Sequence, residues 1–244
     1  MIHTALYAVT GAFLASLLRG FTGFGFVMSA VPLISLALPP TEVVPLVILL
    51  QIEVGLMDLR AAVRLCDWPS LAWLVPGMVI GTPIGLLVLT SLSANSARLA
   101  IGLLIAGSVA VLARGVRLPP RPSRAVTVGV GMVSGTMNGM AGISGPPVMA
   151  YLLARPIDTA AVRASAIVFF MVTASVALVP MADKGLVTRQ ELIWALAASP
   201  VLFLGSRLGA WGFRRTEPRH HRATALIVLS VLAASLILRA LVRA

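Results

Sequence analysis

Long apolar stretches alternate with short polar ones along almost the whole chain. A helix that spans a membrane needs about 20 predominantly apolar residues. Eight stretches come close to or exceed that length: residues 5–38, 42–59, 70–91, 97–115, 123–154, 162–181, 190–212 and 223–242. This pattern predicts an all-α integral membrane protein with about eight spans and up to ten helices.

Two of these stretches are longer than a single span, and each contains a cluster of glycines. Residues 20–25 read GFTGFG and residues 139–145 read GMAGISG. Glycine weakens a helix by about 1 kcal/mol relative to alanine, so we expect both stretches to break here. Non-helical backbone at membrane depth must be buried in protein or line a cavity. The two breaks are therefore the first candidates for a functional site.

The glycine clusters belong to a longer internal repeat. They align at an offset of 119 residues, which places Gly20 on Gly139. Later glycines align at an offset of 124, which places Gly81 on Gly205. We interpret residues 1–244 as a single membrane transporter domain made of two structural repeats, residues 1–118 and residues 119–244. Each repeat is a glycine-broken hairpin followed by three transmembrane helices.

Loop charges indicate how the repeats are oriented. If each broken stretch returns to the side it entered from, the repeats are inverted and the 17 loop and terminal cations divide 12 to 5. If each stretch crosses once, the repeats are parallel and the same charges divide 10 to 7. Cytoplasmic loops are enriched in Lys and Arg, which favours inverted repeats with both termini outside the cytoplasm. The predicted cytoplasmic cations are Arg60, Arg64, Arg114, Arg117, Arg121, Arg124, Arg155, Arg163, Arg214, Arg215, Arg219 and Arg222.

Composition excludes several other classes of protein. The chain is 59% hydrophobic and 11% charged, whereas soluble domains carry about 25% charged residues. The net charge of +11 comes from arginines scattered between apolar stretches, so we expect a lipid bilayer and no nucleic acid as partner. Cys66 is the only cysteine, which excludes a disulfide framework and a thiolate metal site. Nothing resembles a nucleotide-binding loop, so we expect no cofactor and transport driven by a gradient.

The broken segments have the chemistry of an anion site. A helix that starts in the gap directs unpaired N–H groups and its positive dipole end at the gap, and such ends bind anions. Ser144 before glycine and two prolines is typical of a helix start, and Thr22 is the corresponding residue in the first repeat. Two hairpins from opposite faces bring two such ends together near the midplane. The substrate-binding candidates here are Gly20, Thr22, Gly23, Gly25, Asn138, Gly139, Gly142, Ser144 and Gly145.

Three charged residues lie inside apolar stretches, where a charge costs at least about 2.5 kcal/mol and is usually functional or paired. Arg19 precedes the first glycine cluster and aligns with Asn138, and Arg207 lies in a later stretch. Because a guanidinium group matches the oxygens of an oxyanion, we predict that Arg19 or Arg207 binds the substrate. Glu53, near Gln51, is the candidate for proton coupling. The alternative for Glu53 is that it neutralises one of the arginines.

Two short motifs match other functions. Residues 142–145 (GISG) have the G-x-S-G form of intramembrane serine proteases, but the three histidines lie outside the predicted spans or at the end of one. Ser144 therefore has no base to activate it, and we expect no enzyme. Residues 22–25 (TGFG) are similar to the potassium-channel filter, which needs four equivalent loops. An anion channel, or a carrier of small organic carboxylates, stays open as an alternative on the same fold.

Residues 18–32 (LRGFTGFGFVMSAVP) and 134–147 (SGTMNGMAGISGPP) resemble the sulfite exporter TauE/SafE family, which is grouped with the toluene-sulfonate uptake permeases. The likeness extends to residues 66–68 (CDW) and covers nearly the whole chain, although many members read G-x-G-G-G in the broken loops. The resemblance implies a secondary transporter of the bacterial inner membrane. Its implied substrate is a small sulfur-containing anion such as sulfite or a sulfoacetate-like organosulfonate, moved by alternating access. It also implies that the central site is shaped by Gly20, Gly23, Gly142 and Gly145.

Overall fold

The structure is a computed structural model that describes residues 2–22, 25–114, 122–213, 215 and 218–242. Within these ranges the chain forms ten α-helices and no strand. The helices are α1 (Ile2–Thr22), α2 (Phe26–Ser35), α3 (Pro40–Leu65), α4 (Trp68–Ser91), α5 (Ala94–Arg114), α6 (Arg124–Ala141), α7 (Gly145–Ala154), α8 (Thr159–Asp183), α9 (Arg189–Phe213) and α10 (Pro218–Val242).

Each predicted apolar stretch is a helix or a broken pair of helices. The breaks fall at the two glycine clusters, between α1 and α2 and between α6 and α7. By length and composition, four helices of the described residues are able to cross a membrane: α4, α5, α8 and α9. Many large apolar side chains on α4, α9 and α10 are exposed, as expected for surfaces that face lipid. The all-helical fold is therefore confirmed for the described residues, and its long apolar helices are consistent with a membrane protein.

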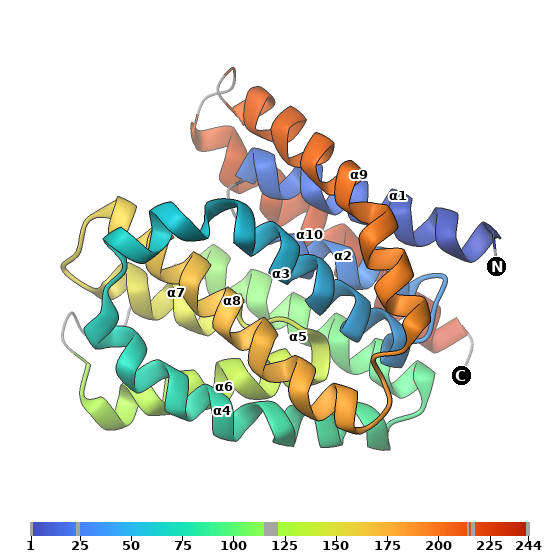
Figure 1. Ribbon diagram of the computed structural model, residues 1–244, viewed down its shortest axis with the longest axis horizontal. Helices are drawn as coiled ribbons and strands as arrows, with labels where there is room; N and C mark the ends of the chain where they lie inside the picture. Colours follow the sequence, from blue (N-terminus) through green and yellow to red (C-terminus); the bar gives the residue numbers. More distant parts are fainter. Residues whose placement is uncertain (1, 23–24, 115–121, 214, 216–217, 243–244) are drawn as a thin grey trace.

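The helices pack in pairs that join the two halves of the chain. α4 lies against α6 along one edge of the molecule and α1 against α9 along the opposite edge (Figure 1). α3 packs against α8, and α5 against α10. These pairs are symmetric with respect to the two halves. If each helix is replaced by the one five places away in the chain, for example α4 by α9 and α6 by α1, the same four pairs result.

The short helices turn back along the helices that precede them. α2 and α7 have 10 residues each, or about 15 Å, which is half the thickness of a bilayer core. A Cβ on Gly11 of α1 would lie 2.7 Å from Ile34 Cγ1 in the last turn of α2. In the other broken pair, Thr127 Oγ1 near the start of α6 donates to Tyr151 Oη of α7 at 3.2 Å. Both short helices thus return toward the end from which their partner helix starts.

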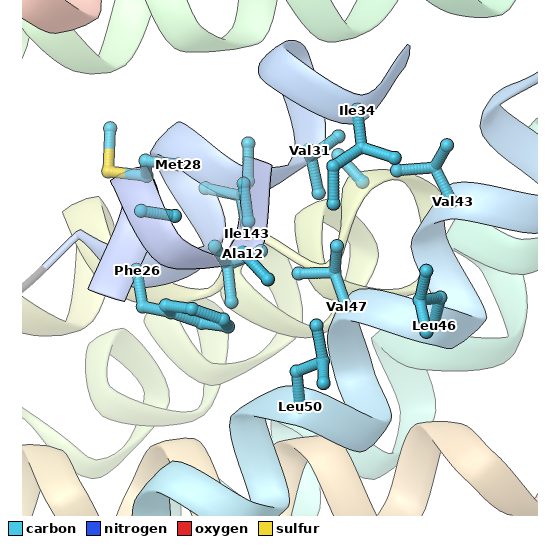
Figure 2. Close-up of a cluster of buried hydrophobic side chains, with 14 of the residues drawn as sticks. Ala12, Phe26, Met28, Val31, Ile34, Val43, Leu46, Val47, Leu50 and Ile143 are labelled. Carbon is cyan, nitrogen blue, oxygen red and sulfur yellow. The ribbon is translucent and has the colours of Figure 1, made fainter. Parts of the chain in front are cut away.

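A buried hydrophobic cluster holds α2 in place. Buried residues of α2 and α3 form one cluster, in which Val31 and Ile34 of α2 lie toward α3 and Met28 lies on the other side of α2 (Figure 2). Its labelled members are Ala12, Phe26, Met28, Val31, Ile34, Val43, Leu46, Val47, Leu50 and Ile143. Most of α2 is buried on all sides, as its continuous apolar sequence predicts for a helix inside a bundle. The cluster therefore fixes where the first break lies relative to α3.

Glycines let α4 and α6 touch backbone to backbone. A Cβ added to Gly77, Gly81 or Gly85 would lie 2.1, 2.1 or 2.0 Å from a carbonyl oxygen of α6. The α6 glycines face back in the same way, since a Cβ on Gly131 would lie 2.1 Å from Leu74 O. The facing carbonyls belong, in order, to Val128, Met132 and Thr136, so the two helices are parallel. Small residues allow this close approach in membranes.

A second close contact and one sequence prediction bear on these glycines. A Cβ on Gly205 of α9 would lie 2.0 Å from Ser16 Oγ of α1, so this glycine also has a packing role. Gly139 was predicted to bind substrate, but a Cβ there would lie 2.0 Å from Thr82 O. Gly139 therefore has a packing role that accounts for its lack of a side chain.

Replacing Gly131 by alanine is expected to destabilise the protein by about 1–3 kcal/mol, because α4 and α6 must separate to admit the methyl group. The matched control is Gly129→Ala on the same helix, where nothing lies within 4 Å of the added Cβ. That change is expected to be neutral or stabilising by up to about 1 kcal/mol, since alanine favours helix. Thermal unfolding in detergent measures both, and equal effects of the two variants would contradict the packing role.

Candidate functional site

A cavity of about 50 Å³ lies where the starts of α2 and α7 meet. Its lining includes Gly25 and the first turn of α2, the last turn of α6, the α6–α7 connection and the first turn of α7. The remaining wall comes from α3 and α8, through residues such as Gln51 and Thr173 that lie near the middle of these long helices. The cavity therefore lies about halfway along α3 and α8.

Two glycines with left-handed backbone form the breaks. Gly25 precedes α2 with φ 87°, and Gly142 ends α6 with φ 70°. Side chains disfavour this region of φ, so glycine is required at both positions. The N–H of Gly142 donates to Asn138 O at 2.6 Å, which closes the last turn of α6. Both glycines line the cavity.

The two helix starts offer unequal sets of N–H donors. The first N–H groups of a helix have no acceptor within it, and in α2 the N–H of Ser29 is the one that returns to Gly25 O, at 3.1 Å. The preceding residues Phe26, Val27 and Met28 line the cavity. In α7 the first turn contains Pro146 and a second proline, and proline has no N–H. We infer that backbone donors come mainly from α2.

Polar side chains come mainly from the second half of the chain. Asn138 Nδ2 donates to Thr173 O at 3.0 Å, and Ser144 Oγ lies 3.3 Å from Thr173 Oγ1. All three residues are at least 95% buried and line the cavity. Ser144 precedes α7 as predicted, but its hydroxyl bonds with Thr173 instead of capping the helix. Sequence reasoning missed Thr173, although a polar residue inside an apolar stretch was the same signal that identified Glu53.

The structure brings part of the predicted site together. The predicted residues that line the cavity are Gly25, Gln51, Asn138, Gly142, Ser144 and Gly145. Gly20, near the end of α1, and Gly139 do not line it. The side chain of Thr22 and the whole of Gly23 lie outside the described residues. The cavity also has apolar walls that the sequence did not single out, including Phe170 and Met149.

The two candidate arginines lie away from the cavity lining. Arg19 Nη2 donates to Asp58 Oδ2 at 3.2 Å. Arg207 is exposed on α9, with its guanidinium carbon 4.3 Å from the centre of the Phe203 ring. Glu53 accepts a hydrogen bond from Ser199 Oγ at 2.7 Å. It is therefore Asp58, and not Glu53, that neutralises Arg19. Substrate binding by either arginine stays a prediction.

The α3–α4 connection, residues 66–68, carries a separate polar cluster. Asp67 forms an ion pair with Arg155 at the end of α7, with 3.6 Å between Oδ2 and Nε. The N–H of Asp67 donates to Ser165 Oγ of α8 at 2.8 Å. Burial is the main cause that raises the pKa of the Cys66 thiol, so this cysteine is protonated and unreactive near neutral pH. The cluster places the ends of α3 and α7 and the starts of α4 and α8 together.

Replacing Arg19 by alanine is expected to destabilise the protein by about 1 kcal/mol, since it leaves Asp58 without its partner. Exchanging the two charges, with Arg19→Asp and Asp58→Arg in one protein, is expected to recover at least half of that loss. Thermal unfolding of both single variants and the exchanged pair measures the coupling. An exchanged protein less stable than either single variant would show that the ion pair contributes nothing.

Comparisons with known proteins agree with these observations. A family model described as "Sulfite exporter TauE/SafE" matches residues 8–236. A protein of Cupriavidus necator named "Probable sulfite/organosulfonate exporter TauE" is 28% identical over 242 residues, which cover 97% of this chain and 94% of that protein. A protein of Comamonas testosteroni named "Probable inner membrane transporter protein TsaS" is 29% identical over 191 residues, covering 75% and 78%. No solved structure matches the chain.

Proposed function

This chain belongs to the sulfite exporter TauE/SafE family, and on that premise we propose that it moves a small sulfur-containing oxyanion or organosulfonate by alternating access. As a member of this family it is a membrane transporter rather than an enzyme, and its place is the bacterial inner membrane. Sulfite and sulfoacetate-like organosulfonates are the proposed substrates, in keeping with the names of its relatives.

The observation that carries this proposal is the cavity between the starts of α2 and α7. Two helix starts with positive dipole ends line one cavity, and Asn138, Ser144 and Thr173 add polar side chains to its lining. Its position at the middle of α3 and α8 fits a site that opens alternately to either side. The protein is proposed to bind its anion there.

Inverted repeats are the proposed architecture around this site, with eight spans and the repeats at residues 1–118 and 119–244. Support comes from the pairing of helices five places apart and from the parallel contact of α4 with α6. The cluster at Asp67 adds to this support, because it gathers the ends of α3 and α7 with the starts of α4 and α8. These are the ends that carry the predicted cytoplasmic cations Arg60, Arg64, Arg155 and Arg163.

With this topology the C-terminus lies in the periplasm. A reporter enzyme fused to it is therefore expected to be active only if that enzyme works in the periplasm. An alkaline phosphatase fusion after residue 244 should be active, because the enzyme needs an oxidising compartment. A matched fusion in the loop between α5 and α6, which contains several of the predicted cytoplasmic cations, should be inactive. Activity of the second fusion alone would overturn the orientation.

Transport is proposed to couple to protons through Glu53. This carboxyl group lies on α3, two residues from the cavity residue Gln51, and accepts a hydrogen bond from Ser199 of α9. An ionisable group at membrane depth with a neutral partner is a candidate proton carrier. The alternative, an anion channel on the same fold, needs no such group.

Purified protein in liposomes is expected to take up radiolabelled sulfite with saturable kinetics, faster when a pH gradient is imposed. Glu53→Gln should lose the stimulation by the pH gradient while retaining anion exchange at equal pH, because the amide keeps the shape of the carboxyl group but carries no titratable proton. The loss in driven uptake should be about tenfold or more, comparable to the removal of one acid–base group.

Ser199→Ala is the matched control for that experiment, since it removes the hydrogen bond to Glu53 and keeps the carboxyl group. It should retain stimulation by the gradient. Uptake that rises linearly with sulfite concentration and ignores the gradient would favour the channel. Full stimulation in Glu53→Gln would remove Glu53 as the proton carrier.

A further inference from the structure

We infer that the cavity selects a singly charged sulfonate that carries a small apolar group, and that it discriminates against doubly charged anions. This inference rests on the proposed function and narrows its substrate class: it keeps the singly charged anions, including hydrogensulfite, and excludes sulfoacetate, whose carboxylate adds a second charge. It follows from three properties of the lining: the charge of its residues, their polarity and the size of the space.

The lining supplies no full positive charge. None of the described residues that surround the cavity is Lys, Arg or His, and residues 21–24 (FTGF) contain no charged residue. Arg19, just before that segment, forms its ion pair with Asp58. What remains are two helix starts, each equivalent to about half an elementary positive charge. Together they balance roughly one negative charge, so a second buried charge would have no counterpart.

Most of the lining is apolar. Four of the 16 lining residues have polar side chains, namely Gln51, Asn138, Ser144 and Thr173. Phe26, Met28, Ile48, Met149 and Phe170 are among the apolar ones. An anion with oxygens on every side, such as sulfate, would leave some of them against hydrocarbon without a donor, which is costly. In an alkylsulfonate the alkyl group takes that place instead.

The size of the cavity limits the alkyl group. A space of about 10–15 Å³ on this measure holds one water molecule, so a cavity of about 50 Å³ has room for roughly three to five groups of that size. This matches a sulfonate group with one carbon. An aromatic sulfonate exceeds that space, so part of its ring would extend beyond the cavity.

Three molecules of nearly the same shape test the inference directly. Dimethyl sulfone, methanesulfonate and sulfate all have tetrahedral sulfur and the same number of non-hydrogen atoms, and they carry no charge, one charge and two charges. Calorimetric titration of the purified protein at neutral pH is expected to show methanesulfonate binding about tenfold or more tightly than either of the others. Toluenesulfonate should bind more weakly than methanesulfonate.

The outcomes separate the inference from the proposed function. Sulfate that binds as tightly as methanesulfonate would overturn the inference and leave sulfur-anion transport standing. Dimethyl sulfone that binds as tightly as methanesulfonate would overturn it as well, because the site would then recognise the shape of the ligand and not its charge. If methanesulfonate, sulfate and sulfite all fail to bind and sulfite is not taken up by liposomes, both the inference and the proposed function are wrong.

A charge added to the lining provides a second test. Gln51→Lys places a cation in the cavity and is expected to shift the ratio of sulfate to methanesulfonate affinity at least about tenfold toward sulfate. Gln51→Met, of similar length and without charge, is the matched control and should keep the wild-type preference. If Gln51→Lys fails to fold, Met149→Lys places a cation in the same cavity from α7. An unchanged ratio in a folded lysine variant would contradict the charge argument.

Discussion

The structure depends on one constraint: backbone that leaves a helix inside a membrane must find its polar partners within the protein. Both broken segments are subject to this constraint, and both line the same cavity. Arg98 of α5 is part of the solution, since its guanidinium donates to Ser35 O at 2.9 Å and to Leu38 O at 3.2 Å. These carbonyls lie at the end of α2, where a helix leaves acceptors unpaired. The opposite end of α2, whose first N–H groups have no acceptor within the helix, lines the cavity.

Sequence patterns predicted the order of the helices, both breaks and the meeting of the two helix starts, because apolar runs and glycine clusters determine these locally. They did not predict that Asp58 pairs with Arg19 or that Thr173 lies beside Ser144. Such contacts depend on the rotation and register of two helices that are distant in the chain. Gly139 shows a further limit of sequence patterns. A small residue allows the close approach either of a ligand or of a neighbouring helix, and only the packing in the structure shows which of the two applies.

The two breaks resemble each other in sequence and differ in what they supply. Arg19 and Asn138 occupy aligned positions, and each reaches the third helix of its own half, Arg19 through Asp58 and Asn138 through Thr173. The first break supplies backbone donors from α2, whereas the prolines of α7 remove donors from the second and side chains take their place. The cavity is therefore lined by two unlike breaks, and we propose that their difference sets the choice of substrate.

The glycine contacts have a consequence for how the molecule moves. The first helix of each half packs closely against the fourth helix of the other half: α6 meets α4 backbone to backbone, and α1 meets α9 where Ser16 lies against Gly205. Interfaces this close slide or separate only at a large cost in packing. In the proposed alternating-access cycle we therefore expect each rigid body to contain helices from both halves of the chain, with α4 and α6 moving together and α1 moving with α9.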